Sequence, residues 1–149
     1  MNSNEQAIQH LYHVAEAKTE DLKAFVNCFT EDGAIVDMSS GTTFRGRNEV
    51  WKTVAIFSKA FPDMHRELHK VFVDGDVVLV ELKLQGTHKG PLELPVGTIH
   101  PTGKTMDAPC CDIFYMVNGK VRLFNCYVEG SIIFAQLGVL FNLQAALTH

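Results

Sequence analysis

The sequence predicts an α+β fold, in which helices precede a meander of long strands. In the first part of the chain, apolar residues recur at helical spacing, and from residue 68 onward their period changes to two. Two short polar segments, residues 74–76 (Asp-Gly-Asp) and 118–119 (Asn-Gly), then separate strand-like runs in the manner of hairpin turns. This order predicts a strongly bent antiparallel sheet wrapped around three helices.

Three helices are expected before the meander. Residues 3–6 (Ser-Asn-Glu-Gln) fit a capping box, and apolar residues at helical spacing extend the first helix to about Lys18. Thr19 can cap the second helix. The third follows a polar loop over residues 39–47, with Asn48 as its cap. The apolar stripes that these helices would bury are Ile8, Leu11, Tyr12 and Ala15, then Leu22, Phe25, Val26 and Phe29, then Val50, Trp51, Val54 and Phe57.

Alternating apolar residues predict one strand before the third helix and four after it. Between the third and fourth strands, residues 87–105 contain three glycines and three of the five prolines, which predicts a long loop or an interrupted hairpin of the kind that often borders a site. Residues 130–140 are expected to form a closing helix. The strands are expected over residues 34–38, 68–73, 77–86, 106–117 and 120–127.

Length and composition describe one globular domain over residues 1–149. Hydrophobic residues make up 46% of the chain, enough to enclose a pocket. The formal charge is −4 and the lysines and arginines are scattered, which argues against a nucleic-acid partner. The first residues lack the basic start of a targeting signal, and no apolar segment approaches the ~20 residues of a membrane span, so we expect a cytoplasmic protein without a membrane partner.

Reduced core thiols are expected at the four cysteines, with disulfides or metal binding as the alternative. They are Cys28, Cys110, Cys111 and Cys126. No Cys-x-x-Cys pair is present, and neighbouring cysteines on a strand point to opposite faces. The histidines with helical ligand spacing are His10 with His13 and His65 with His69. Neither pair has an evident third ligand, and glycine-rich phosphate loops are absent, so no metal and no cofactor is expected.

Motifs along the chain resemble those of one superfamily. Residues 29–37 (Phe-Thr-Glu-Asp-Gly-Ala-Ile-Val-Asp) close a helix, turn and open a strand that ends on Asp37, and Asp112 lies in another apolar strand. Over roughly residues 5–140, the chain resembles a SnoaL-like, ester-cyclase-type member of the nuclear-transport-factor-2-like superfamily, to which ketosteroid isomerase and limonene epoxide hydrolase also belong. Further motifs of this resemblance lie at residues 86–91, 101–103, 118–121 and 136–138 (Gln-Leu-Gly).

The resemblance implies a cone-shaped fold, in which the concave sheet and the helices enclose a deep apolar pocket and a C-terminal helix closes it. A small apolar molecule is the ligand that such a pocket implies. The resemblance also implies a homodimer formed through the outer face of the sheet. Outward apolar positions such as Val77 and Leu79 would lie in that interface.

Asp37 is the first candidate for catalysis. It follows Ile35 by two residues, so both should project to the same side of the strand, where apolar neighbours would make the carboxylate more basic. A general base near neutral pH needs that property. The resemblance implies the same role, since the matching segment of ketosteroid isomerase ends on its proton-abstracting Asp. The alternative is a strand-end Asp that caps the turn at residues 39–41.

Asp112 is the second candidate. It shares a strand face with Cys110, Phe114 and Met116, so it would be buried and held neutral if that face lines a pocket. A neutral carboxylic acid can donate a hydrogen bond to a developing oxyanion, and the resemblance to the Asp-x-Phe strand of ketosteroid isomerase implies that use. The alternative is a structural hydrogen bond to a helix or loop.

His13 is a third candidate by resemblance alone, because it falls where the isomerase has its oxyanion-binding tyrosine. A histidine there could donate to the same oxygen or shuttle a proton. Alternatively, His13 follows Tyr12 around the helix toward solvent. Without the tyrosine of the isomerase, the steroid reaction itself is not expected.

Residues 126–129 (Cys-Tyr-Val-Glu) stand where polyketide cyclases, by resemblance, carry an Asp-aromatic-x-Asp run. Glu129 keeps the second acid, but Cys126 replaces the first, which does the chemistry in those enzymes. Because a neutral thiol is a poor base, Cys126 is not expected to supply the base that the first acid provides for aldol cyclisation in those enzymes. Cys126 is more simply a buried packing residue than a nucleophile, since Arg122 is the only sequence-local group that could activate it.

Further side chains are expected to contact a ligand. His88 is in register with Leu82 and Leu84 at the end of its strand and could face the pocket mouth, although a hydrogen bond within the loop is an equal alternative. Aromatic residues are core residues by default, but some must line any cavity. The full set expected to bind substrate is Trp51, Phe57, His88, Phe114, Cys126 and Glu129.

The sequence therefore favours a small cofactor-independent enzyme that binds an apolar carbonyl compound and moves protons on it, in isomerisation, dehydration or ring closure. Asp37 would be the base, and Asp112 and His13 would stabilise the enolate oxygen. A non-catalytic ligand-binding or dimerisation module on the same fold is the first alternative. Hydrolysis in the manner of limonene epoxide hydrolase is the second. It needs an Arg between two acids, and Arg122 is the only Arg within a strand pattern.

Overall fold

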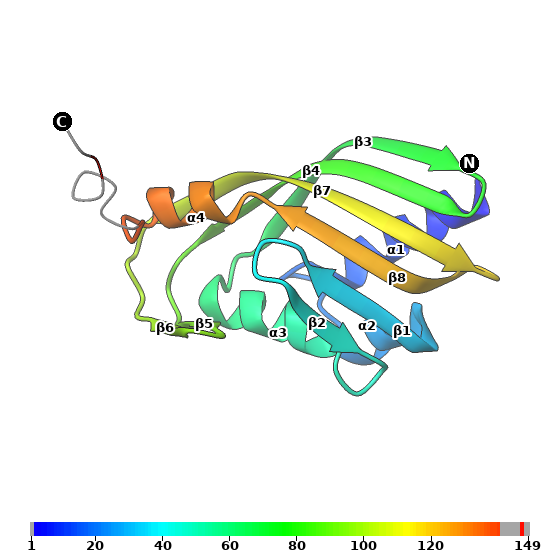
Figure 1. Cartoon of the computed structure of the whole chain (residues 1–149), viewed down its shortest axis with the longest axis horizontal. Coiled ribbons are helices and arrows are strands. Elements are labelled where there is room, and N and C mark those ends of the chain that lie inside the picture. Colours follow the sequence, from blue (N-terminus) through cyan, green and yellow to red (C-terminus); the bar gives the residue numbers. More distant parts are fainter. Residues whose placement is uncertain (1, 141–146, 148–149) are drawn as a thin grey trace.

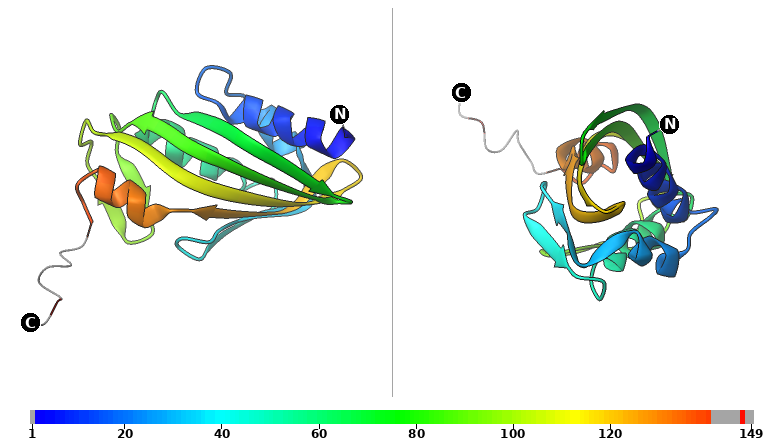
Figure 2. Two further views of the ribbon diagram at one scale, coloured as in Figure 1. Left: turned by 90° about the horizontal axis from the view of Figure 1, so that it is seen from above. Right: turned by 90° about the vertical axis from the view of Figure 1, so that its right-hand side faces the viewer.

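The computed structural model describes residues 2–140 and residue 147. It confirms the α+β architecture: a strongly curved six-stranded sheet wraps around helices α1 (Ser3–Ala15), α2 (Leu22–Asn27) and α3 (Trp51–Ala60) (Figure 1; Figure 2). Helix α4 (Gly130–Gln136) lies at one end of the sheet (Figure 1). Within the described part of the chain, no helix is long and apolar enough to cross a membrane.

The sheet has the strand order β2-β1-β8-β7-β4-β3, and its neighbouring strands are antiparallel except for the parallel pair β1 and β8. The hairpin turns lie where the sequence predicts them, with positive φ at Gly75, Asn118 and Gly119. Glycine and asparagine adopt this conformation most readily. The strands are β1 (Phe29–Asp37), β2 (Thr42–Arg45), β3 (His65–Asp74), β4 (Val77–Thr87), β5 (Leu92–Leu94), β6 (Gly97–Ile99), β7 (Thr105–Val117) and β8 (Lys120–Val128).

Three strand predictions need correction. Strand β2 forms within the predicted loop 39–47 by pairing with β1, and the polar residues around it hide its pattern in the sequence. Strand β1 starts at Phe29 rather than at residue 34, with a register shift between Phe29 and Ala34. Strand β3 starts at His65 rather than at residue 68. Within residues 87–105, the two-stranded hairpin β5–β6 forms, as the interrupted-hairpin alternative predicts.

The helix ends also differ in detail from the prediction. The side chains of Asn2 and Asp21 accept hydrogen bonds from the first turns of α1 and α2, in place of the predicted caps Ser3 and Thr19. Helix α4 ends earlier than predicted, because Gly138 has a φ of 75° and closes the helix in a Schellman motif.

The apolar faces of the helices pack against the concave face of the sheet. Alternate residues of β7 are buried, as a period of two requires. Among the described residues, the buried polar or charged side chains are His88 and Asp112. A buried carboxyl group is costly unless it is neutral or hydrogen-bonded. Asp112 therefore marks a place in the core that needs polar partners.

Candidate active site

A cavity of about 910 Å³ lies between the concave face of the sheet and the helices. Its wall is mainly apolar and includes Leu11 of α1, Ile35 of β1 and Phe57 of α3. A few polar side chains gather within this apolar wall, which is typical of a small-molecule site. The polar residues include Tyr12, Asp37, Ser39, Ser40, Arg66, Cys110, Asp112, Cys126 and Glu129.

The strand register aligns the two candidate acids. Asp37 of β1 pairs with Cys126 of β8, and Cys126 pairs with Asp112 of β7. Paired residues on neighbouring strands point to the same face, and all three of these residues line the cavity. With about 4.8 Å between strands, the α-carbons of Asp37 and Asp112 are roughly 10 Å apart along this row. The row leaves room for a small molecule between the two acids.

Tyr12 and Asp112 form the polar floor of the cavity. The Tyr12 hydroxyl donates a hydrogen bond of 2.6 Å to Oδ2 of Asp112. Helix α1 brings Tyr12 to this point because its buried stripe faces the sheet. The Tyr12 ring packs edge-on against Phe114, with the ring centroids 5.9 Å apart. Asp112 is only 3% exposed, and these contacts hold its carboxyl group in one orientation.

Burial raises the pKa of the Asp112 carboxyl group, because the ionised form loses its hydration. Hydrogen bonds from Tyr12 and Cys110 act in the opposite direction without cancelling this effect. Burial also raises the pKa of Tyr12 well above its usual value, and the neighbouring Asp112 adds to the shift. Both shifts favour the protonated forms. The Tyr12 hydroxyl donates its proton to Asp112, so the protonated carboxyl group of Asp112 is the group that can donate a hydrogen bond to a ligand oxygen.

We expect Asp112 to make the protein less stable as the pH rises. The unfolded chain ionises this carboxyl group near pH ~4, whereas the raised pKa delays its ionisation in the folded chain. Between the two pKa values the folded state holds the additional proton, so the free energy of unfolding falls with rising pH. Asp112→Asn should flatten this fall in urea unfolding curves at several pH values. Equal slopes in the two proteins would contradict the prediction.

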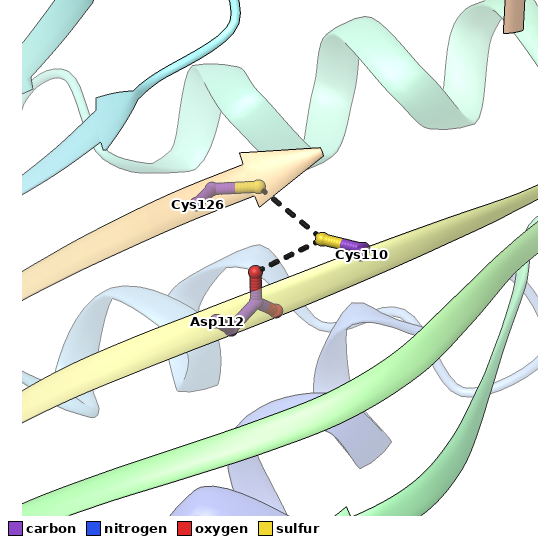
Figure 3. A group of neighbouring side chains, drawn as sticks. All are labelled: Cys110, Asp112 and Cys126. Atoms are coloured by element: carbon purple, nitrogen blue, oxygen red, sulfur yellow. Dashed lines mark hydrogen bonds between the residues drawn. The ribbon is translucent and has the colours of Figure 1, made fainter. Parts of the chain in front are cut away.

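Cys110 and Cys126 lie beside Asp112 on the cavity floor (Figure 3). The Cys110 thiol donates to Oδ1 of Asp112 at 3.2 Å, and the two sulfurs are 3.8 Å apart. The hydrogen bond that it shares with Cys126, together with burial, raises the pKa of Cys110. The same hydrogen bond lowers the pKa of Cys126, but burial and the nearby Asp112 outweigh it and the net shift is upward. These raised values argue against Cys126 as a nucleophile.

Asp37 lines the cavity and also caps the turn that follows it. Its Oδ1 accepts hydrogen bonds from the backbone N–H of Ser39 at 2.9 Å and from the Ser39 hydroxyl at 2.6 Å. Its Oδ2 accepts one from the Ser40 hydroxyl at 3.0 Å. The geometry thus accommodates both the catalytic and the structural alternative for this residue. Asp37 is half-buried and accepts hydrogen bonds from two hydroxyl groups. Its surroundings are therefore more polar than the apolar ones that the strand pattern predicts.

The structure places His13 outside the cavity. Its side chain is exposed on α1, whereas Tyr12 takes the inward position. The expectation that His13 faces the oxyanion site is therefore wrong, because one helical step turns a side chain by about 100°. The sequence already indicated which of the two side chains faces inward, since Tyr12 belongs to the predicted buried stripe of this helix and His13 does not.

The cavity wall contains three of the six side chains that were expected to bind substrate. They come from helix α3, from strand β8 and from the residue that precedes α4. Two of them belong to the Cys-Tyr-Val-Glu run at residues 126–129. These three residues are Phe57, Cys126 and Glu129.

The structure corrects the other three expectations about substrate contacts. Trp51 is 36% exposed and donates its Nε1–H to the backbone carbonyl of Asn48. Phe114 is fully buried behind the cavity floor. His88 is buried in the loop after β4, where its Nδ1 accepts from the backbone N–H of Thr102. Burial also lowers the pKa of His88. These side chains support the fold and do not line the cavity.

Arg66 is a cavity residue that the sequence pattern missed. It lies in β3, which begins earlier than predicted, and its positive charge partly offsets the raised pKa of Asp112. Its Nη1 donates to the backbone carbonyl of Ala15 at 2.8 Å. Arg122, the arginine that the pattern placed in a strand, is exposed on β8.

The curved sheet, the helices it surrounds and the cavity define a protein of the nuclear-transport-factor-2-like class. Within this class the chain belongs to the SnoaL-like family, because the sequence model of the SnoaL-like domain family matches residues 8–124. The resemblance inferred from the sequence is therefore confirmed. No curated protein matches the chain.

Several solved structures share this fold. A protein from Jannaschia sp. CCS1, described as a SnoaL-like polyketide cyclase, has a TM-score of 0.79 at 20% identity, with 91% of each chain covered. A protein from Catenulispora acidiphila with a ketosteroid isomerase-like fold, in complex with trimethylamine, has a TM-score of 0.73 at 22% identity, with 95% of this chain and 97% of its own covered. IdmH from Streptomyces antibioticus, described as a polyketide cyclase, has a TM-score of 0.75 at 21% identity, with 93% and 100% covered. At these identities the structures establish the fold alone.

Proposed function

We propose that this protein is a cofactor-independent enzyme that binds an apolar carbonyl compound and moves a proton on it, in isomerisation, dehydration or ring closure. The observation that supports this most is the row in the cavity in which Asp37 and Asp112 flank Cys126. Asp37 is partly exposed and held by hydroxyl groups, whereas Asp112 is buried and held by Tyr12. Two carboxyl groups in such different surroundings fit the separate roles of base and acid.

In the proposed mechanism, the carbonyl oxygen of the substrate lies at the cavity floor. Protonated Asp112 donates a hydrogen bond to that oxygen, and Tyr12 keeps the carboxyl group oriented. Asp37 removes a proton from the carbon next to the carbonyl, which places the negative charge of the enolate on the bound oxygen. Return of the proton to another carbon isomerises the substrate. Expulsion of a hydroxyl group, which takes the proton from Asp37 and leaves as water, dehydrates it. Attack of the enolate carbon on a second carbonyl closes a ring, and the oxygen of that carbonyl takes the proton from Asp37.

The comparisons support a small molecule as the ligand. Two of the structural neighbours are described as polyketide cyclases, and a third holds trimethylamine. In this chain Cys126 replaces the first acid of the cyclase motif, while Glu129 keeps the second. In our proposal Asp37 and Asp112 therefore carry out the acid–base chemistry. Cys126 lines the cavity between them.

Deuterium exchange tests this function before the natural substrate is known. The protein is incubated in D₂O with a panel of apolar cyclic and linear ketones, and deuterium next to the carbonyl is followed by NMR. At least one ketone is expected to exchange faster than in buffer alone, and Asp37→Asn should abolish the difference. Ketones that bind without any exchange would favour the non-catalytic binding module.

Epoxide hydrolysis is a second candidate, because Arg66 lines the cavity together with Asp37 and Asp112. An arginine between two acids is what that mechanism requires. However, Tyr12 makes the hydrogen bond to Asp112, and Arg66 donates to the backbone of Ala15 instead. Epoxides added to the same panel separate the two functions, since diol formation that depends on Arg66 would favour hydrolysis.

We also propose a homodimer formed through the outer face of the sheet. Val77 and Leu79 alternate with the buried Val78 and Val80, and Phe72, which pairs with Leu79, is 50% exposed. Covering these apolar side chains with a second copy removes them from water. Sedimentation at micromolar concentrations should give the mass of a dimer, and Phe72→Glu should shift it toward a monomer. A monomer mass for the unaltered protein at all concentrations would refute the dimer.

A further inference from the structure

The floor of the cavity brings together three side chains of types that bind metal ions. The Sγ atoms of Cys110 and Cys126 and a carboxylate oxygen of Asp112 all lie within 4.8 Å of one another. They come from the adjacent strands β7 and β8 and point toward one another (Figure 3). The three residues do not have the sequence spacing of a known metal-binding motif. The two cysteines come close only because strands β7 and β8 pair.

Two of the three distances in this cluster fit a tetrahedral zinc ion. With a zinc–sulfur bond of ~2.3 Å and a zinc–oxygen bond of ~2.0 Å, two thiolates lie about 3.8 Å apart, and a thiolate lies about 3.5 Å from a carboxylate oxygen. The structure has 3.8 Å between the two sulfurs and 3.2 Å between Sγ of Cys110 and Oδ1 of Asp112. These two distances therefore need to change little when an ion binds.

A disulfide fits the same pair of cysteines less well. Cys110 pairs with Val128, and Cys126 pairs with Asp112, so the two cysteines are diagonal neighbours on their strands. The α-carbons of diagonal neighbours are about 7–8 Å apart, whereas a disulfide needs roughly 4.4–6.8 Å. The sulfurs can share an ion without the backbone movement that a direct bond would require.

The surroundings of the cluster also suit a metal. The Tyr12 hydroxyl holds Oδ2 of Asp112, and Oδ1 is the oxygen that lies beside the Cys110 thiol. An outer partner of this kind orients a carboxylate that binds a metal. All three side chains line the cavity, which supplies an entry path and room for a fourth ligand.

We propose that Cys110, Asp112 and Cys126 form a zinc site whose fourth position is open to the cavity. Two thiolates favour zinc over magnesium or calcium. When the ion binds, both thiols and the carboxyl group release their protons to the buffer, and the charge of the ion stabilises the resulting anions. The site goes beyond the proposed function and does not depend on it. Asp112 is protonated when no ion is bound and ionised when it binds zinc, so the two states exclude each other in any one molecule.

Cobalt(II) provides a spectroscopic test of this site. Reduced full-length protein without a histidine tag is stripped of metal with a chelator and titrated with cobalt(II), then with zinc. The absorption bands of tetrahedral, thiolate-bound cobalt should saturate at one ion per chain and disappear when zinc is added. Cys110→Ser and Cys126→Ser should weaken zinc binding by more than the ~10–100-fold expected for Tyr12→Phe, which removes only the outer partner.

Cys111→Ser and Cys28→Ser are the matched controls. Cys111 follows Cys110 in β7 but faces the other side of the sheet, and Cys28 lies at the end of α2. Both variants should keep the spectrum and the affinity. Circular dichroism checks folding, and if Cys110→Ser does not fold, Cys126→Ser decides, because Cys126 is less buried. A missing thiolate spectrum in the unaltered protein, or its persistence in Cys126→Ser, would overturn the proposal whatever the deuterium experiment shows.

Discussion

Asp37→Asn is expected to lower the rate of proton transfer by about 10²–10⁴-fold while the fold and the ligand affinity are kept. The asparagine has nearly the same size and can still accept a hydrogen bond from the turn at Ser39 and Ser40. Its amide cannot take up a proton near neutral pH. The measurement is kcat and KM for a ketone that exchanges deuterium, and a loss confined to kcat is the expected pattern.

Ser40→Ala is the matched control for this variant. It removes the hydrogen bond of 3.0 Å to Oδ2 of Asp37 but leaves the carboxylate in place. A much smaller change in kcat is expected, so that the loss in Asp37→Asn can be assigned to the missing base. If Asp37→Asn turned over at the same rate as the unaltered protein, the base would have to be another group, and the binding module would become the better account.

The general fold could be predicted from the sequence because it depends on local patterns. A change of apolar period from helical to two distinguishes helices from strands, and the turns at Gly75 and Gly119 need residues that accept positive φ. The short strands β2, β5 and β6 could not be located in the same way, although the turn residues in 87–105 allowed an interrupted hairpin there. They are three or four residues long and exist through pairing with a neighbour, which no local pattern records.

The candidate site could be predicted only in part. Asp37 and Asp112 stand out because acids in apolar strands are unusual, and the structure places both at the cavity. Their common row could not be foreseen, since Asp37 meets Cys126 through the parallel pairing of β1 with β8. Arg66 was missed because the start of β3 was placed too late. Tyr12 was assigned to the core by its helical stripe, and its hydroxyl bond to Asp112 gives it a polar role as well.

Asp112→Ala is expected to lower the same rate by about 10²–10³-fold, because it removes a hydrogen-bond donor from the enolate oxygen. Asp112→Asn should do less harm, since an amide of nearly the same size can still donate to that oxygen and accept from the Tyr12 hydroxyl. Turnover and unfolding free energy should be measured together. The alanine variant leaves the buried Tyr12 hydroxyl without its partner, which costs about 1–3 kcal/mol of stability.

Affinity for an enolate mimic separates oxyanion binding from a structural role of Asp112. A phenol presents an oxygen like that of the enolate but no carbon-bound proton for Asp37 to remove. If Asp112 holds the oxyanion, the phenol should bind well to the unaltered protein and to Asp37→Asn, and much more weakly to Asp112→Ala. If Asp112 were purely structural, Asp112→Ala would lower stability but not the affinity or turnover of the folded molecules. The oxyanion site would then lie elsewhere in the cavity, and Asp37 alone would keep its catalytic assignment.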